Sequence, residues 1–392
     1  MKVIIDEKKI DEILSRGVEN VYPSRDEVKK ILLSGKTLSL YNGIDPTGPT
    51  LHIGHGSTLM KLREFQDLGH KVILLIGDFT GRIGDPTDKS VTRKQLSTKE
   101  VKENLKLYTK QAGKILDMKK VQVKFNSKWL SKLSFEDVVN LASEFTLQQM
   151  IERDMFSKRI KEGQPIHLHE FFYPLMQGYD SVAMNVDMEI GGNDQTFNML
   201  VGRTMMKNRG KEKSVLTTKL LVDPTGKKMG KSEGNMVTLQ DTPENMFGKI
   251  MSWPDTLMPL AFEICTRVPL SEIKKIEQMN PRDAKISLAY EIVKIYCGEK
   301  DAVKAQDAWE KTFSKGEVPE NIEEIQAKGG ELVSDVLVQN SVLSSKSEWR
   351  RLVDGKGAHD LDTDQAISDP NIKVERGLTL KLGKKKFIKI IV

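Results

Sequence analysis

Two apolar segments, each followed by a glycine-rich turn, constrain the fold of this chain more than any other feature. Residues 37–44 (TLSLYNGI) are expected to form a strand, and apolar residues recur at helical spacing over 52–68 after the loop DPTGPT. A second strand, 71–76 (KVILLI), is apolar throughout, which is typical of burial on both faces, and it leads into GDFTGRIGDPTD. Short strands that alternate with helical stretches predict an open parallel α/β sheet.

The pattern changes along the rest of the chain. Between residues 96 and 159 it is mostly helical, apart from a strand-like segment at 121–125 (VQVKF). The last strand candidate is 217–222, which leads into a lysine- and glycine-rich loop over 223–235. After Thr242 the pattern becomes helical, so we expect a domain boundary near residue 235.

A second boundary is expected in a segment rich in Gly, Lys and Glu around residues 315–330. The chain that follows opens with the basic amphipathic helix SKSEWRRLVDG and ends in short β-like segments. These changes predict three domains: an α/β domain, a helical domain and a small α+β domain, over 1–235, 236–325 and 331–392.

Composition excludes several classes of protein. With 392 residues, of which 38% are hydrophobic and 30% charged, the chain can bury a core and is not intrinsically disordered. Its two cysteines, Cys265 and Cys297, form no CxxC pair, which argues against a disulfide scaffold and a cysteine-based zinc site. No apolar segment approaches the roughly 20 residues of a membrane helix, and the amino-terminal segment is charged. We therefore expect a soluble, cytoplasmic protein without a membrane partner.

The formal net charge of +6 is concentrated at the carboxyl end. Residues 371–392 contain seven Lys or Arg and one Glu, so this segment accounts for the whole excess. A basic end on a neutral body predicts a polyanionic partner. On charge alone, a tail that merely increases solubility stays open as the alternative.

A histidine motif lies where the first glycine-rich loop becomes a helix. In His52-Ile53-Gly54-His55, a helix start directs backbone N–H groups at an anion, as in nucleotide-phosphate sites. Gly54 would let a flat nucleoside approach the backbone, and the two histidines can donate hydrogen bonds to phosphate oxygens. Alone the motif is weak, because two histidines could equally cap a core helix.

A lysine motif supplies a second candidate for phosphate chemistry. The segment 227–232 (KKMGKS) contains three lysines and a glycine, a combination suited to the charge of a breaking triphosphate. A solvated surface loop is the alternative, and the spacing is not that of a P-loop.

Together, these two motifs resemble the signatures of class I aminoacyl-tRNA synthetases. The whole chain resembles the bacterial tyrosyl-tRNA synthetase family, through YNGIDPTGPTLHIGH, GDFTGRIGDPT, YPLMQGYDS, IGGNDQ and KKMGKS. The resemblance implies an α/β Rossmann-like catalytic domain with a parallel sheet and a helical insertion at about 120–165. It further implies a helical anticodon-side domain and a C-terminal S4-like α+β RNA-binding domain.

The resemblance also implies an amino-acid pocket. A phenol hydroxyl both donates and accepts hydrogen bonds, so Asp180 could accept its proton while the Tyr41 hydroxyl donates to its oxygen. Without the motif, Asp180 would be taken for a helix-surface carboxylate and Tyr41 for a core residue. The implied tyrosine-binding residues are Tyr41, Asp85, Tyr173, Gln177, Asp180 and Gln195.

The same resemblance implies ATP, with Mg²⁺ bound to it as a substrate complex, and no tightly bound protein metal. His167 and His169 could suggest a metal pair, but the sequence offers no third ligand nearby. The implied catalytic residues are Thr47, His52, His55, Lys228 and Lys231. The implied ATP-binding residues are Gly43, Asp45, His52, Gly54, His55, Gly192, Asp194, Val222, Lys228, Met229 and Lys231.

Implied partners are tyrosine-specific tRNA and a second copy of the chain, which would form a homodimer through the helical region near 125–160. The implied RNA-binding residues are Lys346, Arg350, Arg351, Lys384, Lys385 and Lys386.

Three departures from common family patterns affect individual roles. Asn42 stands where one branch has cysteine, Gly230 replaces a serine, and Thr196-Phe197 follow GGNDQ where another branch has a tryptophan. The motifs leave three rival functions: a tryptophanyl-tRNA synthetase, a non-catalytic RNA-binding derivative and an HxGH nucleotidylyltransferase. The Tyr41/Asp180 pair and the basic tail disfavour the first, and the presence of both motifs disfavours the other two.

Overall fold

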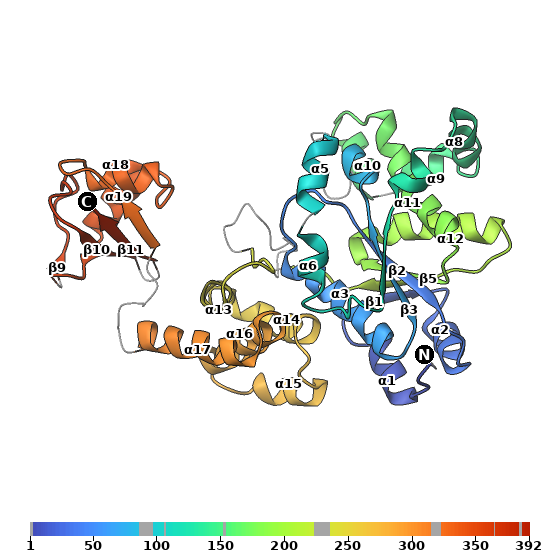
Figure 1. Cartoon of the computed structure of the whole chain (residues 1–392), viewed down its shortest axis with the longest axis horizontal. Coiled ribbons are helices and arrows are strands. Elements are labelled where there is room, and N and C mark those ends of the chain that lie inside the picture. Colours follow the sequence, from blue (N-terminus) through green and yellow to red (C-terminus); the bar gives the residue numbers. More distant parts are fainter. Residues whose placement is uncertain are drawn as a thin grey trace. The chain divides into compact units, whose positions relative to one another are not determined.

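The computed structural model describes residues 3–85, 97–105, 107–151, 154–222, 236–314, 323–363, 365–383 and 386–392. Its contacts separate the chain into two units, Met1–Ala302 and Val303–Val392 (Figure 1). This division differs from the composition change near residue 235, because the helices that follow it pack within the first unit. A separate functional role for residues 236–325 therefore stays a prediction.

The first unit contains a six-stranded sheet in the order β1-β6-β5-β2-β3-β4. All neighbouring strands are parallel except β1, which pairs antiparallel with β6 at one edge. The α/β fold with a largely parallel sheet is thus confirmed. The strands are β1 (Val18–Tyr22), β2 (Ser39–Ile44), β3 (Lys71–Ile76), β4 (Val121–Phe125), β5 (Met188–Gly192) and β6 (Ser214–Thr218).

Strand predictions succeeded where the apolar pattern was strong. β3 and β4 have the expected bounds, and β2 begins two residues later than expected. The expected strand at 217–222 was wrong in position, because Ser214–Thr218 is the segment that is buried throughout and pairs with β5. β1 was not anticipated, since VENVY is half polar, as edge strands often are.

Helices flank the sheet along the whole first unit. Among them, α3 contacts β2, β3 and β5, and α11 packs against α12. The helices up to β6 are α1 (Glu7–Ile13), α2 (Arg25–Leu33), α3 (Ile53–Asp67), α4 (Thr80–Ile83), α5 (Thr98–Leu105), α6 (Tyr108–Ala112), α7 (Ser127–Leu130), α8 (Phe135–Ala142), α9 (Leu147–Ile151), α10 (Asp154–Lys161), α11 (Leu168–Met184) and α12 (Thr196–Asn208). A 3-10 turn, η1 (Asn193–Gln195), precedes α12.

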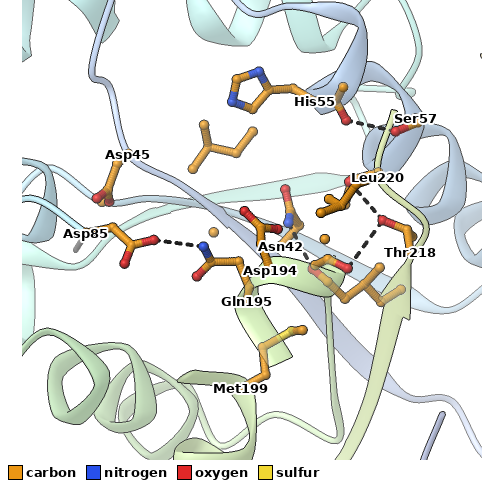
Figure 2. Close-up of a pocket in the computed structure, with 18 of the residues that line it drawn as sticks. Asn42, Asp45, His55, Ser57, Asp85, Asp194, Gln195, Met199, Thr218 and Leu220 are labelled. Carbon is orange, nitrogen blue, oxygen red and sulfur yellow. Dashed lines mark hydrogen bonds between the residues drawn. The ribbon is translucent and has the colours of Figure 1, made fainter. Parts of the chain in front are cut away.

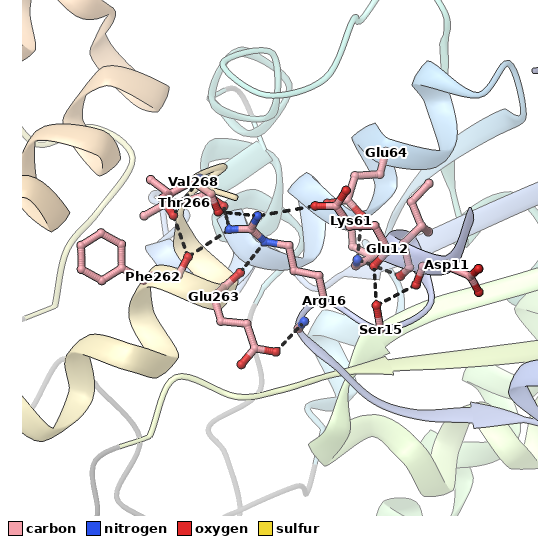
Figure 3. A network of polar contacts seen from close by, with 12 residues as sticks. Asp11, Glu12, Ser15, Arg16, Lys61, Glu64, Phe262, Glu263, Thr266 and Val268 are labelled. Atoms are coloured by element: carbon pink, nitrogen blue, oxygen red, sulfur yellow. Dashed lines mark hydrogen bonds and ion pairs between the residues drawn. The ribbon is translucent and has the colours of Figure 1, made fainter. Parts of the chain in front are cut away.

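The later helices of the first unit are fixed to α3 and to the amino-terminal segment. Gly56 of α3 allows Tyr296 of α16 to approach closely, since a Cβ atom at Gly56 would lie 2.1 Å from the tyrosine oxygen. Arg16 donates hydrogen bonds to four carbonyl groups at the end of α14 and just beyond it (Figure 3). These helices are α13 (Pro243–Met251), α14 (Met258–Cys265), α15 (Leu270–Ile276), α16 (Pro281–Cys297) and α17 (Glu299–Ser314), with the 3-10 turn η3 (Asp255–Leu257).

The second unit, into which α17 extends, contains a five-stranded sheet in the order β7-β11-β10-β8-β9. Its core includes the fully buried Trp349, whose indole N–H donates to the carbonyl of Pro370 at 2.8 Å. The expected helix at SKSEWRRLVDG and the β-like end are confirmed. The elements are β7 (Glu323–Gln326), α18 (Val333–Gln339), α19 (Lys346–Asp354), β8 (Ala358–Asp360), β9 (Gln365–Ala366), β10 (Leu378–Leu382) and β11 (Lys386–Ile391).

Over the part of the chain that the structure describes, every helix is too short or too polar to span a bilayer.

Candidate functional site

A cavity of about 590 Å³ opens at the carboxyl ends of β2, β3 and β5, beside the start of α3 (Figure 2). In open α/β sheets, this is the edge at which ligands bind. The cavity brings together most residues that the sequence motifs indicated. Those that line it are Tyr41, Gly43, Asp45, Thr47, His52, Gly54, His55, Asp85, Tyr173, Gln177, Asp180, Gly192, Asp194 and Gln195.

Four of the expected pocket residues are not among them. Val222 does not line the cavity, whereas Leu220 and Leu221 just before it do. The ATP-binding residue expected at Val222 is therefore offset by one or two positions along the chain. Lys228, Met229 and Lys231, together with the Gly230 departure, lie outside the described residues.

The start of α3 holds both motif histidines against its backbone. The His52 ring accepts a hydrogen bond at Nδ1 from the Gly54 N–H (3.1 Å), and His55 Nδ1 accepts one from the His52 N–H (3.3 Å). A neutral imidazole that accepts at Nδ1 carries its proton on Nε2. Each ring can therefore present an N–H donor beside the helix start, where the backbone already favours an anion.

A short backbone pairing joins α3 to the chain beyond the lysine motif. The Ile53 N–H donates to the Val237 carbonyl (3.0 Å), and the Leu239 N–H donates to the Leu51 carbonyl (2.9 Å). Leu221 and Met236 both line the cavity. The described residues on either side of 223–235 thus reach the same cavity as the histidines. No sequence motif indicated this pairing.

Two carboxylates lie on the wall formed by the first and second glycine-rich turns. The Tyr173 hydroxyl donates to Asp45 Oδ2 (2.8 Å), and the Thr80 hydroxyl donates to Asp45 Oδ1 (2.7 Å). Burial, reinforced by Asp45, raises the pKa of Tyr173 well above its usual value, so the phenol stays protonated. Gly77 is required here, because a Cβ atom would lie 1.9 Å from Asp45 Oδ1.

Asp85 is the second of these carboxylates. The side-chain amide of Gln195 donates to Asp85 Oδ2 at 2.7 Å, as the dashed line in Figure 2 shows. The family resemblance implies that both residues bind tyrosine. Both line the cavity, Asp85 from the second glycine-rich turn and Gln195 from η1.

Asp180 of α11 occupies a buried position at another part of the wall. The Trp129 indole N–H donates to Asp180 Oδ1 (2.7 Å), and the Asn126 amide donates to Oδ2 (3.3 Å). Burial raises the pKa of Asp180 well above its ordinary value, although these two donors act in the opposite direction. Sequence reasoning missed Trp129 and Asn126. Their position directly after the strand at 121–125 was the available signal.

Tyr41 of β2 is fully buried and lines the cavity, with its hydroxyl 2.8 Å from the Ser181 hydroxyl. Its neighbour Asn42 donates to the Ile190 carbonyl of β5 (2.8 Å). Asn42 therefore joins two strands, although it also lines the cavity (Figure 2).

Within the described ranges, no group of three or more His, Cys, Asp and Glu side chains is placed to hold a metal ion. The His167 and His169 rings lie 5.7 Å apart at the start of α11.

The expected RNA-binding residues lie in the second unit. Arg350 and Arg351 are exposed on α19. Lys346 forms an ion pair with Asp335 (2.5 Å), and the Lys386 ammonium donates to the Val342 carbonyl, so both of these side chains also make contacts within the unit. Lys384 and Lys385 lie outside the described residues.

Comparisons with known proteins agree with the fold. The family model of class I tRNA synthetases (W and Y) matches residues 33–314. The chain is similar to the tyrosine–tRNA ligase of Carboxydothermus hydrogenoformans, with 46% identity over 97% of each protein. It is also similar to the tyrosine–tRNA ligase of Thermotoga maritima, with 44% identity over 96% of each.

Solved structures show the same fold. The C-terminally truncated mitochondrial tyrosyl-tRNA synthetase of Aspergillus nidulans matches with a TM-score of 0.67 and 24% identity, over 78% of this chain and 94% of that one. The Archaeoglobus fulgidus tyrosyl-tRNA synthetase complexed with L-tyrosine matches with a TM-score of 0.63 and 23% identity, over 77% of this chain and 100% of that one.

Proposed function

The chain belongs to the class I tRNA synthetases of the tryptophan and tyrosine type, and on this premise we propose how its cavity carries out the reaction. Its activity is that of its tyrosine–tRNA ligase relatives: it activates tyrosine with ATP and attaches it to tRNA. The family expected from the two motifs is confirmed. The tryptophan-specific, non-catalytic and nucleotidylyltransferase alternatives are set aside, because relatives over nearly the full length are tyrosine–tRNA ligases.

One observation carries the assignment of the site: Tyr41, Asp180 and the histidine-bearing start of α3 line a single cavity. Tyrosine would enter with its phenol toward Tyr41 and Asp180, and with its ammonium group toward Asp85, Tyr173 and Gln177. Gln195 would face its carboxylate. A buried carboxylate suits a phenol, because in a dry pocket an unpaired hydroxyl is costly.

ATP would occupy the part of the cavity beside α3. Gly43, Asp45 and Gly54 would lie near the nucleotide, Gly192 and Asp194 near its ribose, and Leu221, which lines the cavity next to Val222, near its adenine. Thr47 and the two histidines would contact phosphate oxygens, joined by Lys228 and Lys231, with Met229 beside them. Mg²⁺ would arrive with ATP, held mainly by phosphates and water.

The chemistry needs no protein nucleophile. A carboxylate oxygen of tyrosine attacks the α-phosphorus of ATP, the bond from that phosphorus to the bridging oxygen breaks, and pyrophosphate leaves with the electron pair. A hydroxyl of the terminal ribose of tRNA then attacks the acyl carbon, and AMP leaves. The protein therefore acts by positioning the reactants and by stabilising charge at the phosphates. The Nε2 protons of His52 and His55 suit this second role.

Transfer-RNA binding is proposed for the later parts of the chain. Residues 236–325 would face the anticodon side and 331–392 would form the S4-like RNA-binding domain. Exposed Arg350 and Arg351, with the basic residues of the carboxyl end, support contacts to phosphates. We place the enzyme in the cytoplasm, where its substrates occur.

A homodimer is proposed through the helical region near residues 125–160 and the adjoining start of α11. Phe135 of α8 is 85% exposed and Leu168 of α11 is 79% exposed, which is unusual for such side chains and typical of an interface. Further exposed apolar side chains on α8 to α11 are Val139, Leu147, Ile160 and Phe172. Sedimentation of the Phe135→Asp/Leu168→Asp protein should give a monomer, and an unchanged dimer would contradict this interface.

Exchange of labelled pyrophosphate into ATP tests the proposed site as a whole. We expect exchange with tyrosine, and none above background with tryptophan or without an amino acid. Tyr41→Phe and Asp180→Ala should each reduce the tyrosine-dependent rate. If both variants exchanged like the wild type, the phenol assignment would be wrong even though the enzyme is a tyrosine ligase.

A further inference from the structure

A buried charged pair adjoins the proposed phenol site, and its acidic member, Glu189, lines the cavity. Lys213, just before β6, is 0% exposed, and Glu189 of β5 is 2% exposed; the two side chains form an ion pair. Ser181 of α11 is likewise 0% exposed and contacts both. Burying two charges is costly, so a pair in this position is a candidate for a functional role.

The pair is connected to both ends of the proposed amino-acid pocket. Lys213 Nζ donates to Ser181 Oγ (2.7 Å), which lies 2.8 Å from the Tyr41 hydroxyl. Glu189 Oε1 accepts a hydrogen bond from the Gln177 amide at 3.0 Å. The cluster thus touches a residue assigned to the phenol and a residue assigned to the ammonium group.

An ammonium group can only donate hydrogen bonds, and this determines which atom is the donor in the hydrogen bonds from Lys213 through Ser181 to Tyr41. Lys213 cannot accept, so Ser181 Oγ must be the acceptor of their hydrogen bond. The hydrogen of Ser181 can then go to Tyr41, at 2.8 Å, or to Glu189 Oε2, at 3.5 Å. The shorter distance favours Tyr41, and Glu189 Oε2 is already engaged by Lys213.

This direction keeps the hydrogen of Tyr41 away from Ser181, so that it can go into the cavity or to Glu189, which also interacts with the Tyr41 hydroxyl. If Ser181 donates to the Tyr41 oxygen, the Tyr41 hydroxyl hydrogen points elsewhere, and Tyr41 lines the cavity. Without the ammonium, Ser181 could instead donate to Glu189 and accept from Tyr41. The Tyr41 hydrogen would then be turned away from a bound amino acid.

We propose that Lys213 is a specificity-determining positioning residue, which acts through Ser181 to keep the Tyr41 hydroxyl as a donor to the phenol oxygen of tyrosine. This inference rests on the proposed role of Tyr41. Phenylalanine offers no oxygen to receive that donor, so its binding leaves a buried hydroxyl unpaired. In a variant without the Lys213 ammonium, phenylalanine should bind without the cost of an unpaired Tyr41 hydroxyl. Tyrosine should lose the hydrogen bond that the Tyr41 hydroxyl donates to its phenol oxygen.

The test compares tyrosine with phenylalanine in pyrophosphate exchange. Lys213→Met/Glu189→Gln removes both charges together, so no uncompensated charge is buried, and Gln at 189 keeps an oxygen for Gln177. The ratio of kcat/KM for tyrosine to that for phenylalanine should fall about tenfold, the order of one hydrogen bond. The KM for tyrosine should rise and the KM for ATP should not.

The chain offers a matched control. Lys211 and Asp187 form a more exposed ion pair (3.5 Å) between the same two segments, each two residues earlier. Lys211→Met/Asp187→Asn should leave the selectivity ratio unchanged. If the buried variant also kept the wild-type ratio, or lost activity equally for both amino acids, Lys213 would have only a structural role and the proposal would fail.

Two single variants complete the design. Ser181→Ala should lower the ratio by itself, and combining it with the Lys213/Glu189 change should add no further loss; additive losses would overturn the relay through Ser181. If the charge-free variant does not fold, Ser181→Ala alone decides. Tyr41→Phe distinguishes the assignment of the phenol pocket from the proposed relay through Ser181. If Tyr41→Phe keeps the wild-type tyrosine-to-phenylalanine ratio, the pocket assignment itself is wrong. If Tyr41→Phe lowers the ratio but Ser181→Ala does not, only the relay through Ser181 is wrong.

Discussion

The indole N–H of Trp129 donates a 2.7 Å hydrogen bond to Asp180 Oδ1, from the helix that follows β4 to the middle of α11. The bond fixes the carboxylate at the cavity wall, so that its orientation does not depend on the substrate. It also explains why a buried acid is tolerated there, since one oxygen has a strong donor and the other has Asn126.

Trp129→Phe keeps an aromatic ring and removes the donor. We expect the KM for tyrosine to rise about tenfold, because Asp180 loses the bond that orients it, while the KM for ATP stays the same. Steady-state pyrophosphate exchange measures both. A variant with unchanged KM for tyrosine would show that Trp129 does not contribute to the pocket.

The raised pKa of Asp180 predicts a pH-dependent stability difference. An unfolded aspartate loses its proton near pH 4, whereas the folded one holds it to higher pH, so ionisation of Asp180 destabilises the folded state as pH rises above about 4. Asp180→Asn cannot ionise. Its Tm minus that of the wild type should therefore increase from pH 4 toward neutrality. A difference independent of pH would contradict a raised pKa.

The phosphate side should behave as a transition-state site. His52→Ala and Lys231→Ala should each lower the rate of adenylate formation about 10²–10³-fold, the range expected for a lost charge-stabilising donor. Neither residue is assigned to the amino acid, so equilibrium binding of tyrosine should barely change. Single-turnover kinetics separates the two quantities, and a large loss of tyrosine affinity with normal chemistry would contradict the assignment.

The carboxyl-terminal unit should act on RNA only. β7 pairs with β11, so a clean truncation removes residues 323–392 rather than cutting after Gly330. The truncated protein should form tyrosyl-adenylate at a near-normal rate and charge tRNA poorly. Replacing Lys384, Lys385 and Lys386 by alanine should flatten the salt dependence of tRNA binding, by about 0.7–0.9 log units per lost phosphate contact. Unchanged slopes would leave solubility as the only role of the tail.

Sequence was sufficient where a single segment carries its own signal. KVILLI could be assigned to a central strand because it is apolar throughout, and His52 and Asp180 could be assigned from local motifs. Contacts between distant segments could not be predicted in this way. Lys213 stands in the polar segment GKEKS, which resembles a surface turn, and only the fold shows that it is buried against Glu189. The strand β6 was misplaced for the same reason, because its burial depends on β1 and β5.

The central claim is that Asp180 accepts a hydrogen bond from the phenol hydroxyl of tyrosine, and one variant tests it most directly. Tyrosine-dependent pyrophosphate exchange by Asp180→Ala, at saturating ATP, should show kcat/KM for tyrosine lowered by at least about 10²-fold, since the phenol hydroxyl loses its acceptor in a buried site. Asp26→Asn, which alters an exposed carboxylate of α2, should retain wild-type exchange. Wild-type exchange by folded Asp180→Ala would contradict the account.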